Sequence, residues 1–257
     1  MTYKQQYIAF QTILIKEILR FMRIWIQTIL PPAITTTLYF VIFGNLIGSQ
    51  IQDMDGFSYM DYIVPGLILM AVITNAYANV VSSFYGSKFQ RNVEEMIISP
   101  TPNYIILLGF VAGGVARGII VGIVVTLVSL FFTDLHIHNF LITAIVIILT
   151  ATLFSLGGFI NAVFAQSFDD ISIVPTFVLT PLTYLGGIFY SIHMLSDFWQ
   201  TLSLINPILY MVNAFRYGIL GVTDIPLTVA FSIIILFTIV LYAWSLWLLK
   251  KGVGIRS

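Results

Sequence analysis

The sequence of 257 residues contains no cysteine, which excludes disulfides, thiol catalysis and thiolate metal sites. Charged residues are also scarce, at 9% of the chain against about 25% in soluble proteins. A soluble globule of this size needs more charge to cover its surface, so a water-soluble enzyme is disfavoured. Eleven basic residues balance eleven acidic ones, so no net positive field favours a nucleic-acid partner.

The motifs of common catalytic and nucleotide-binding sites are missing as well. The chain has no Gly-x-Ser-x-Gly elbow, no His-Glu-x-x-His pair and no Gly-x-x-x-x-Gly-Lys-Ser/Thr loop. His136 and His138 have only Asp134 nearby in sequence, and zinc needs three or four convergent ligands, so we expect ordinary interfacial histidines. Asp169 and Asp170 fall in a short connection, which favours a solvated turn over a catalytic carboxylate pair. The sequence therefore predicts no enzyme, no cofactor and no metal site.

Apolar residues are abundant, at 59% of the chain, and they gather in long runs. A bilayer core about 30 Å thick needs about 20 apolar residues per helix. Six runs meet this requirement: 24–47, 63–85, 104–132, 140–165, 171–190 and 228–249. The sequence predicts an all-α membrane protein with six transmembrane helices, in which residues 24–257 form a single transmembrane domain.

The basic residues set the expected orientation of these helices. Nine of the eleven lie in segments that an even number of crossings places on one side: Lys4, Lys16, Arg20, Arg23, Lys88, Arg91, Lys250, Lys251 and Arg256. The positive-inside rule then puts both termini and the 86–103 connection in the cytoplasm. Arg216 lies on the opposite side. Arg117 falls inside the third run, where it either extends to the head groups or belongs to a buried ion pair.

Residues 1–23 have the spacing of an amphipathic helix. One face carries Phe10, Leu14, Ile18 and Phe21, and another carries Thr12, Lys16, Arg20 and Arg23. Such a helix lies in the cytoplasmic interface with its basic side chains toward anionic lipid head groups. Pro31 and Pro32 follow early in the first apolar run, where we expect a kink rather than a full break.

Polar and small residues recur at helical spacing inside the apolar runs. Asn75, Asn79 and Ser82 form a stripe at i, i+4 and i+7, and Asn161, Thr176 and Thr180 lie in the fourth and fifth runs. The third run carries Gly109, Gly113, Gly118 and Gly122 at intervals of four or five residues. Two interpretations remain open for both patterns: helix–helix packing, or a translocation path between subunits.

Two connections are longer than a turn requires. In the 86–103 connection, Arg91 and Glu95 are spaced to pair across one helical turn, and Ser99-Pro100 should end that helix. The helix would be either a surface feature or a docking element. The 191–227 connection is apolar and aromatic, so we expect short helices, broken at Asn206-Pro207, that enter the outer leaflet.

Two segments resemble those of a known family, the type-2 ABC exporter permeases. Arg91-Asn92-Val93-Glu94-Glu95, followed by Ser99-Pro100, is similar to the family's coupling-helix segment. Pro181-Leu182-Thr183-Tyr184-Leu185-Gly186-Gly187-Ile188-Phe189-Tyr190, followed by Asn206-Pro207-Ile208-Leu209-Tyr210, is similar to its fifth span and outer loop. The resemblance covers essentially the whole chain and follows the expected order along it.

The resemblance implies a permease subunit of an ATP-driven exporter in a bacterial cytoplasmic (inner) membrane, with a re-entrant outer segment between helices 5 and 6. It implies a homodimer, surrounded by membrane lipids, with two copies of a separate cytoplasmic ATPase bound beneath. Coupling to the ATPase would involve Arg91, Glu94, Glu95, Ser99 and Pro100. The path would involve Asn75, Asn79, Ser82, Asn161, Thr176 and Thr180, for a hydrophobic or amphiphilic drug, lipid or lipid-linked glycan. The alternative is a secondary, ion-coupled transporter, which would stop when ion gradients collapse.

Overall fold

A computed structural model describes residues 1–47 and 53–254 of the chain. Its regular structure in these ranges is helical, apart from one isolated bridge between Met54 and Phe57. Residues 50–52, in the connection between the first and second apolar runs, lie outside the described residues, as does Arg256, which was predicted to be cytoplasmic.

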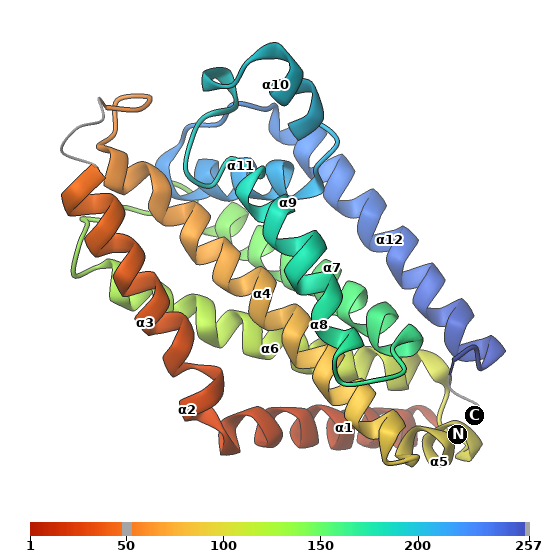
Figure 1. The fold of residues 1–257 in the computed structure, drawn as a ribbon. Coiled ribbons are helices and arrows are strands. Elements are labelled where there is room, and N and C mark those ends of the chain that lie inside the picture. Colours follow the sequence, from red (N-terminus) through yellow and green to blue (C-terminus); the bar gives the residue numbers. More distant parts are fainter. Residues whose placement is uncertain (48–52, 255–257) are drawn as a thin grey trace.

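Five helices are long and apolar enough to cross a membrane, which confirms the all-α membrane class. They are Trp25–Phe43, α4 (Tyr59–Phe89), α6 (Asn103–Ser129), α7 (Phe140–Phe164) and α12 (Leu227–Lys251). The first of these comprises α2 (Trp25–Thr28), α3 (Leu30–Tyr39) and the start of a π-helical segment, Phe40–Ile47. Figure 1 shows that these helices run between the same two ends of the molecule.

The second apolar run was predicted to end at residue 85, but α4 continues to Phe89. The extra turn is stabilised by Lys88, whose Nζ donates to the carbonyls of Val163 (2.8 Å) and Ala165 (2.7 Å). These carbonyls belong to the C-terminal end of α7, which has no further helical N–H groups to bind them. Lys88, which was predicted to lie in a connection, therefore joins the ends of α4 and α7.

The fifth apolar run forms a shorter helix than predicted. It consists of α8 (Asp170–Val174), a π turn (Pro175–Leu179) and α9 (Thr180–Tyr184), which follow one another directly. Two prolines remove backbone donors inside this segment, and the wide turn accommodates them. The predicted end at Tyr190 was wrong because Gly187, with φ +71°, adopts a left-handed conformation that does not continue a helix.

The N-terminal segment forms the predicted helix, α1 (Tyr3–Arg23), which ends with the chain turning at Ile24. In Figure 1 it lies across one end of the bundle, beside α5 (Asn92–Ile98) and both termini. It packs closely on α6, where a Cβ atom at Gly109 would lie 2.5 Å from Ile13 and one at Gly113 would lie 2.5 Å from Glu17. The glycines of α6 therefore serve helix packing, as the first of the two interpretations proposed.

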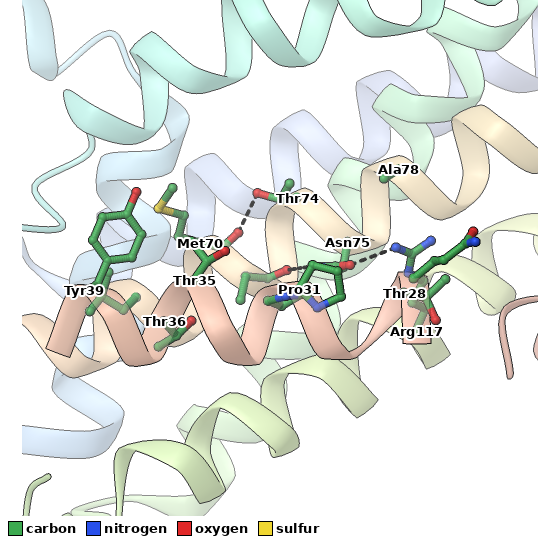
Figure 2. Close-up of a pocket in the computed structure, with 14 residues that line it drawn as sticks. Thr28, Pro31, Thr35, Thr36, Tyr39, Met70, Thr74, Asn75, Ala78 and Arg117 are labelled. Carbon is green, nitrogen blue, oxygen red and sulfur yellow. Dashed lines mark hydrogen bonds between the residues drawn. The ribbon is translucent and has the colours of Figure 1, made fainter. Parts of the chain in front are cut away.

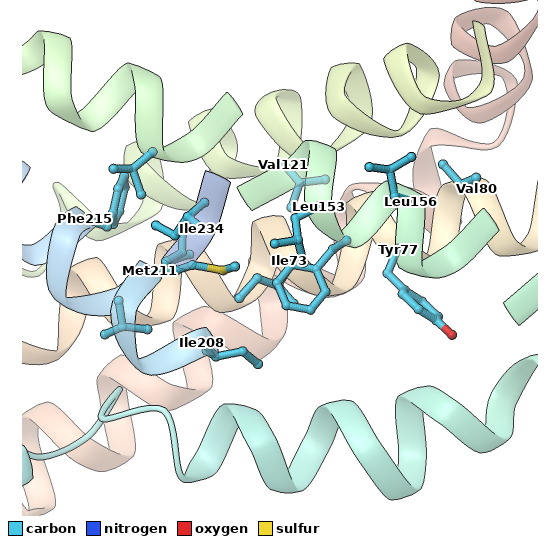
Figure 3. Close-up of a cluster of buried hydrophobic side chains, with 14 of the residues drawn as sticks. Ile73, Tyr77, Val80, Val121, Leu153, Leu156, Ile208, Met211, Phe215 and Ile234 are labelled. Atoms are coloured by element: carbon cyan, nitrogen blue, oxygen red, sulfur yellow. The ribbon is translucent and has the colours of Figure 1, made fainter. Parts of the chain in front are cut away.

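The connection after α9 contains a short 3-10 turn, α10 (Asp197–Ser203) and α11 (Pro207–Leu220). The predicted break at Asn206-Pro207 is confirmed. α10 is exposed, with Phe198 69% accessible, whereas α11 is packed into the bundle. Figure 3 shows Ile208, Met211 and Phe215 of α11 in the main core beside side chains of the long helices.

Candidate functional site

A cavity of ≈ 350 Å³ lies between the first membrane helix and α4 (Figure 2). Its walls combine hydroxyl and amide side chains with apolar ones: Gln27, Thr28, Pro31, Pro32, Thr35, Thr36, Tyr39, Leu67, Met70, Ala71, Thr74, Asn75, Ala78 and Arg117. One end holds Arg117, and the other is bounded by Tyr39. A concave site of this volume that combines polar and apolar groups can hold a small molecule.

The first helix is shaped by its prolines. Pro31 and Pro32 occupy the first turn of α3, where the absent N–H groups cost no helical hydrogen bond. The preceding α2 is tied back to α1, because the Oγ1 of Thr28 donates to the carbonyl of Phe21 at 3.0 Å. The predicted kink is confirmed, with an interruption between α2 and α3 at Ile29.

Arg117 lies at the middle of the 27-residue α6 and is part of the cavity wall. Its Nη2 donates to Oδ1 of Asn75 at 2.9 Å, and its buried Nε has no hydrogen-bond partner among the residues that the structure describes. Within the described residues Arg117 joins no ion pair and bonds a neutral amide, so the ion-pair alternative was wrong there. The alternative in which Arg117 extends to the head groups stays a prediction.

A second polar cluster joins α1 to α4. Glu17 is fully buried, its Oε1 accepts from the hydroxyl of Ser83 at 2.6 Å, and its Oε2 lies 3.4 Å from Nε of Arg20. Arg20 in turn donates from Nη2 to the carbonyl (2.9 Å) and to Oδ1 (2.8 Å) of Asn79. The expectation that Arg20 faces the lipid head groups was therefore wrong.

The burial of Glu17 has a signal in the sequence. Glu17 follows Ile13 by four residues and precedes Phe21 by four, so it lies on the apolar face of α1. A carboxylate on that face needs a partner inside the protein, and Arg20 at i+3 is within reach. The interpretation of α1 as a simple lipid-facing amphipathic helix missed this cluster.

Of the six predicted path residues, the structure places Asn75 alone in the cavity wall. Asn79 is buried against Arg20, and Ser82 bonds the carbonyl of Ala78 in its own helix. Asn161 donates from Nδ2 to the carbonyl of Ile171 at 3.3 Å. Thr176 and Thr180 lie exposed on the α8–α9 segment, apart from this cavity.

The predicted coupling residues surround α5. Glu94 and Glu95 lie in its first turn, where the N-terminal end of a helix favours negative charge, and Ser99 adopts an extended conformation that ends the helix before Pro100. The predicted pairing of Arg91 with Glu95 was wrong. Arg91 precedes α5 in a left-handed conformation (φ 61°), so its side chain does not share a helical face with Glu95.

A second crevice, of ≈ 470 Å³, opens at the same end of the molecule. Four segments line it: the end of α4 (Lys88), α5 with the residue before it (Arg91 and Glu94), the residues after α7 (Gln166) and the residues after α12 (Gly254). Beside it, the rings of Tyr85, Phe89 and Phe168 pack with centroid distances of 4.9 to 6.5 Å. Ile98 is 85% exposed and Phe89 is 66% exposed, and apolar groups displayed next to charged ones are typical of a protein contact surface.

The remaining titratable candidates occupy turns. The backbone N–H groups of Gln166 (2.8 Å) and Ser167 (3.1 Å) donate to the Asp170 carboxylate. Asp170 thus caps the α7–α8 turn, as the solvated-turn interpretation predicts. At the opposite end, the His138 ring packs edge-on against Tyr217.

Comparison with known proteins identifies the same family that the sequence motifs resemble. The family model for the ABC-2 type transporter matches residues 8–220. The inner membrane transport permease YadH of Escherichia coli (strain K12) is 59% identical over 253 residues, covering 98% of each chain. Nodulation protein J of Rhizobium leguminosarum bv. viciae is 21% identical over 83% of each chain, and its counterpart in Sinorhizobium fredii (strain NBRC 101917 / NGR234) is 22% identical over 84% of this chain and 82% of its own.

Proposed function

Because the chain belongs to the ABC-2 type transporter family, as the membrane subunit of an ABC transporter, we propose that it is the permease of an exporter driven by a separate ATPase. The observation that carries the proposal is the exposed α5 surface with its adjoining crevice, at the end that holds both termini. A 59% identical relative named as an inner membrane transport permease supports an inner-membrane location.

We propose six membrane crossings. The start of α1 and the end of α12 lie at the same end of the molecule in Figure 1, and five crossings would place them on opposite sides. The α8–α9 segment supplies the sixth: its 15 helical residues extend about 22 Å, and the following residues continue toward the outer end. The positive-inside rule assigns the end with α1 and α5 to the cytoplasm. The buried α11 is then the proposed re-entrant outer segment, since its residues from Ile208 to Arg216 are all buried inside the bundle.

The proposed coupling route is mechanical. Two permease copies would provide twelve crossings above two ATPase chains, whose closure on ATP would push on α5. The 31-residue α4 begins the route, because it runs without interruption from the corner beside α5 to the cavity at Thr74 and Asn75. The cluster of Glu17, Arg20 and Asn79 would make α1 move with α4.

The proposed cargo is hydrophobic or amphiphilic. The cavity beside α4 combines apolar side chains such as Leu67 and Met70 with hydroxyl groups such as those of Thr35 and Thr74. Thr176 and Thr180 would join the path if the exposed α8–α9 face lines it in the assembled dimer. Ser82 and Asn161, which bond main-chain carbonyls, would support the path rather than face it.

Charge reversal on α5 tests the coupling proposal. We expect an affinity-tagged wild-type permease, purified from its native host, to bring an ATPase chain with it. The Glu94→Arg/Glu95→Arg variant should retain at least tenfold less ATPase, a loss of about 1.4 kcal/mol of binding free energy. The matched control is Asp134→Arg/Asp197→Arg, which reverses two exposed carboxylates at the opposite end and should retain the ATPase.

Two results would contradict the proposal. Equal recovery of the ATPase by both double variants would show that α5 is not the docking element. Absence of any ATPase from the wild-type preparation, with transport that stops when ion gradients are collapsed at constant ATP, would instead support an ion-coupled carrier.

A further inference from the structure

We propose that the cavity between α3 and α4 binds the anionic headgroup of an amphiphilic cargo, and that Arg117 is the residue that binds it. The proposal rests on the permease function above and specifies the chemical class of its cargo. The shared chemistry is that of an oxyanion, such as a phosphate or carboxylate, attached to an apolar chain.

The first step concerns charge. Arg117 lies in a membrane-crossing helix, one turn beyond Gly113, on which Glu17 of α1 packs. An ionised side chain inside a membrane is unfavourable unless a partner or a hydrated cavity receives it. The nearest carboxylate cluster does not neutralise it, because Glu17 is engaged by Arg20 at 3.4 Å. Within residues 1–47 and 53–254, that is the sole ion pair, so the Arg117 cation has no protein counter-ion there.

The second step concerns hydrogen bonds. A guanidinium group has five N–H donors in a planar fork that matches the oxygens of a phosphate or carboxylate. Among the described residues, Arg117 uses Nη2 to bond Asn75, while its buried Nε has no partner. Asn75 is neutral, so it orients the guanidinium without cancelling its charge. Donor capacity and charge therefore remain for a ligand in the adjoining cavity.

The third step concerns the shape of the cavity. Figure 2 shows Arg117 and Thr28 at one end, with Met70 and Tyr39 toward the other. The Arg117 end offers a cation, because the Thr28 hydroxyl already donates to the carbonyls of Phe21 and Ile24. The far end offers the Met70 thioether and the Tyr39 ring, beside threonine hydroxyls. An amphiphile fits this gradient with its headgroup at Arg117 and its chain along Met70. A free inorganic anion would leave the apolar end empty.

Binding to the full-length permease, purified in dodecyl maltoside without its ATPase, tests this proposal. The probe is radiolabelled dodecyl phosphate in equilibrium dialysis. Dodecyl maltoside, a neutral detergent with the same twelve-carbon chain, is present in excess, so it already competes for binding through the chain alone. We expect saturable binding of one molecule per chain that inorganic phosphate at equal concentration does not displace. The Arg117→Gln variant should bind at least tenfold more weakly, Arg117→Lys should retain part of the affinity, and Arg23→Gln, which removes an exposed cation from α1, should bind normally.

A further variant separates binding from folding. Asn75→Asp places a carboxylate where the amide oxygen now accepts from Arg117 at 2.9 Å. This internal counter-ion should raise the thermal stability of the permease and lower its affinity for dodecyl phosphate by at least tenfold. A purely structural role for Arg117 would not produce these opposite changes.

Several outcomes would overturn the proposal: affinity that is unchanged in Arg117→Gln or in Asn75→Asp, no saturable binding in the excess of neutral detergent, or displacement by an equal concentration of inorganic phosphate. The last result would identify a simple anion site. None of these outcomes involves the ATPase, so they leave the permease function untouched, whereas the α5 charge reversal tests that function without reference to the cavity.

Discussion

Among the described residues, four charged side chains lie inside the helical packing, and they make three kinds of contact. Glu17 and Arg20 pair with one another, Arg117 bonds an amide beside a cavity, and Arg216 stacks on an aromatic ring. Burial of charge is unfavourable unless it is compensated, so each contact reports a specific role. The pair stabilises a helix interface, Arg117 faces a site for a ligand, and Arg216 holds the outer segment.

Arg216 is expected to stabilise the outer half of the molecule. The side chain is 1% exposed, its guanidinium carbon lies 4.0 Å from the centre of the Tyr62 ring, and Nη2 donates to the carbonyl of Gly187. A desolvated cation–π contact is worth about 2 kcal/mol or more. Arg216→Ala should therefore lower the midpoint of thermal unfolding in detergent, and Arg216→Lys should recover only part of the loss, because an ammonium group cannot stack as a plane. Arg23→Ala, at an exposed position, should leave the midpoint unchanged, and an equal midpoint for Arg216→Ala would contradict the assignment.

At the residue scale, the sequence identified some of the candidate site and missed the rest for a physical reason. Asn75 stands out because an amide inside an apolar run must find a partner. The hydroxyls of Thr28, Thr35 and Thr74 do not stand out, since threonine can satisfy its hydroxyl on the carbonyl four residues earlier, as Thr74 does with Met70. Which threonines face a cavity depends on the neighbouring helix, and the sequence alone does not position that helix.

At the scale of elements, the long helices were predictable and their ends were not. Hydropathy requires about 20 apolar residues for a crossing, and five of the six predicted runs form such helices. The end of α5 was also predictable, because Pro100 acts locally on Ser99. The extension of α4 to Phe89 was not, because it depends on bonds from Lys88 to α7, 75 and 77 residues away in sequence.

The interface between α1 and α6 gives a test with a matched pair of glycines. Gly113 lies under Glu17, and an added Cβ would come within 2.5 Å of the Glu17 Cβ, whereas Gly86 in α4 has no neighbour within 4 Å. Gly86→Ala should stabilise the protein by up to about 1 kcal/mol through helix propensity. Gly113→Ala should destabilise it by about 1–3 kcal/mol, because α1 must move away from α6. Thermal unfolding in detergent measures both changes, and equal stabilisation by the two substitutions would show that the close contact of α1 with α6 is absent.

The cluster that joins α1 to α4 predicts a cost of removing its negative charge. Glu17→Gln keeps the side-chain volume and an acceptor for Ser83, but it leaves Arg20 without its carboxylate. Loss of one partner of a buried ion pair typically costs about 3–5 kcal/mol, and the partial exposure of Arg20 should reduce this to about 1–2 kcal/mol. If a protease cuts α1 of this variant faster while the thermal unfolding of the remaining bundle is unchanged, the loss of stability lies at α1. The double variant Glu17→Gln/Arg20→Gln should be less destabilised than the single one, and a greater loss would argue against the pairing.

At the scale of the whole molecule, the proposed ATPase surface and the proposed outer segment lie at opposite ends of the helices. α1, α5 and both termini share the first end, whereas α10 and the buried α11 occupy the second. The cavity lies between these ends and is bounded by helices that continue to the first one. In the proposed route, a displacement of α5 reaches α4 through the short turn at Gln90 and Arg91 and continues along α4 to the cavity.

The number of crossings is the property on which this arrangement depends, and the natural absence of cysteine makes it measurable. Single cysteines at Asp169 and Asp197, both exposed, flank the α8–α9 segment. If that segment crosses the membrane, a membrane-impermeant maleimide added to cells with a permeabilised outer membrane should label Asp197→Cys and spare Asp169→Cys until the inner membrane is opened. Glu95→Cys and Asp134→Cys calibrate the protected and the labelled response. Equal labelling of Asp169→Cys and Asp197→Cys would leave five crossings, place the two termini on opposite sides of the membrane, and remove α5 and the C-terminal segment from a common ATPase surface.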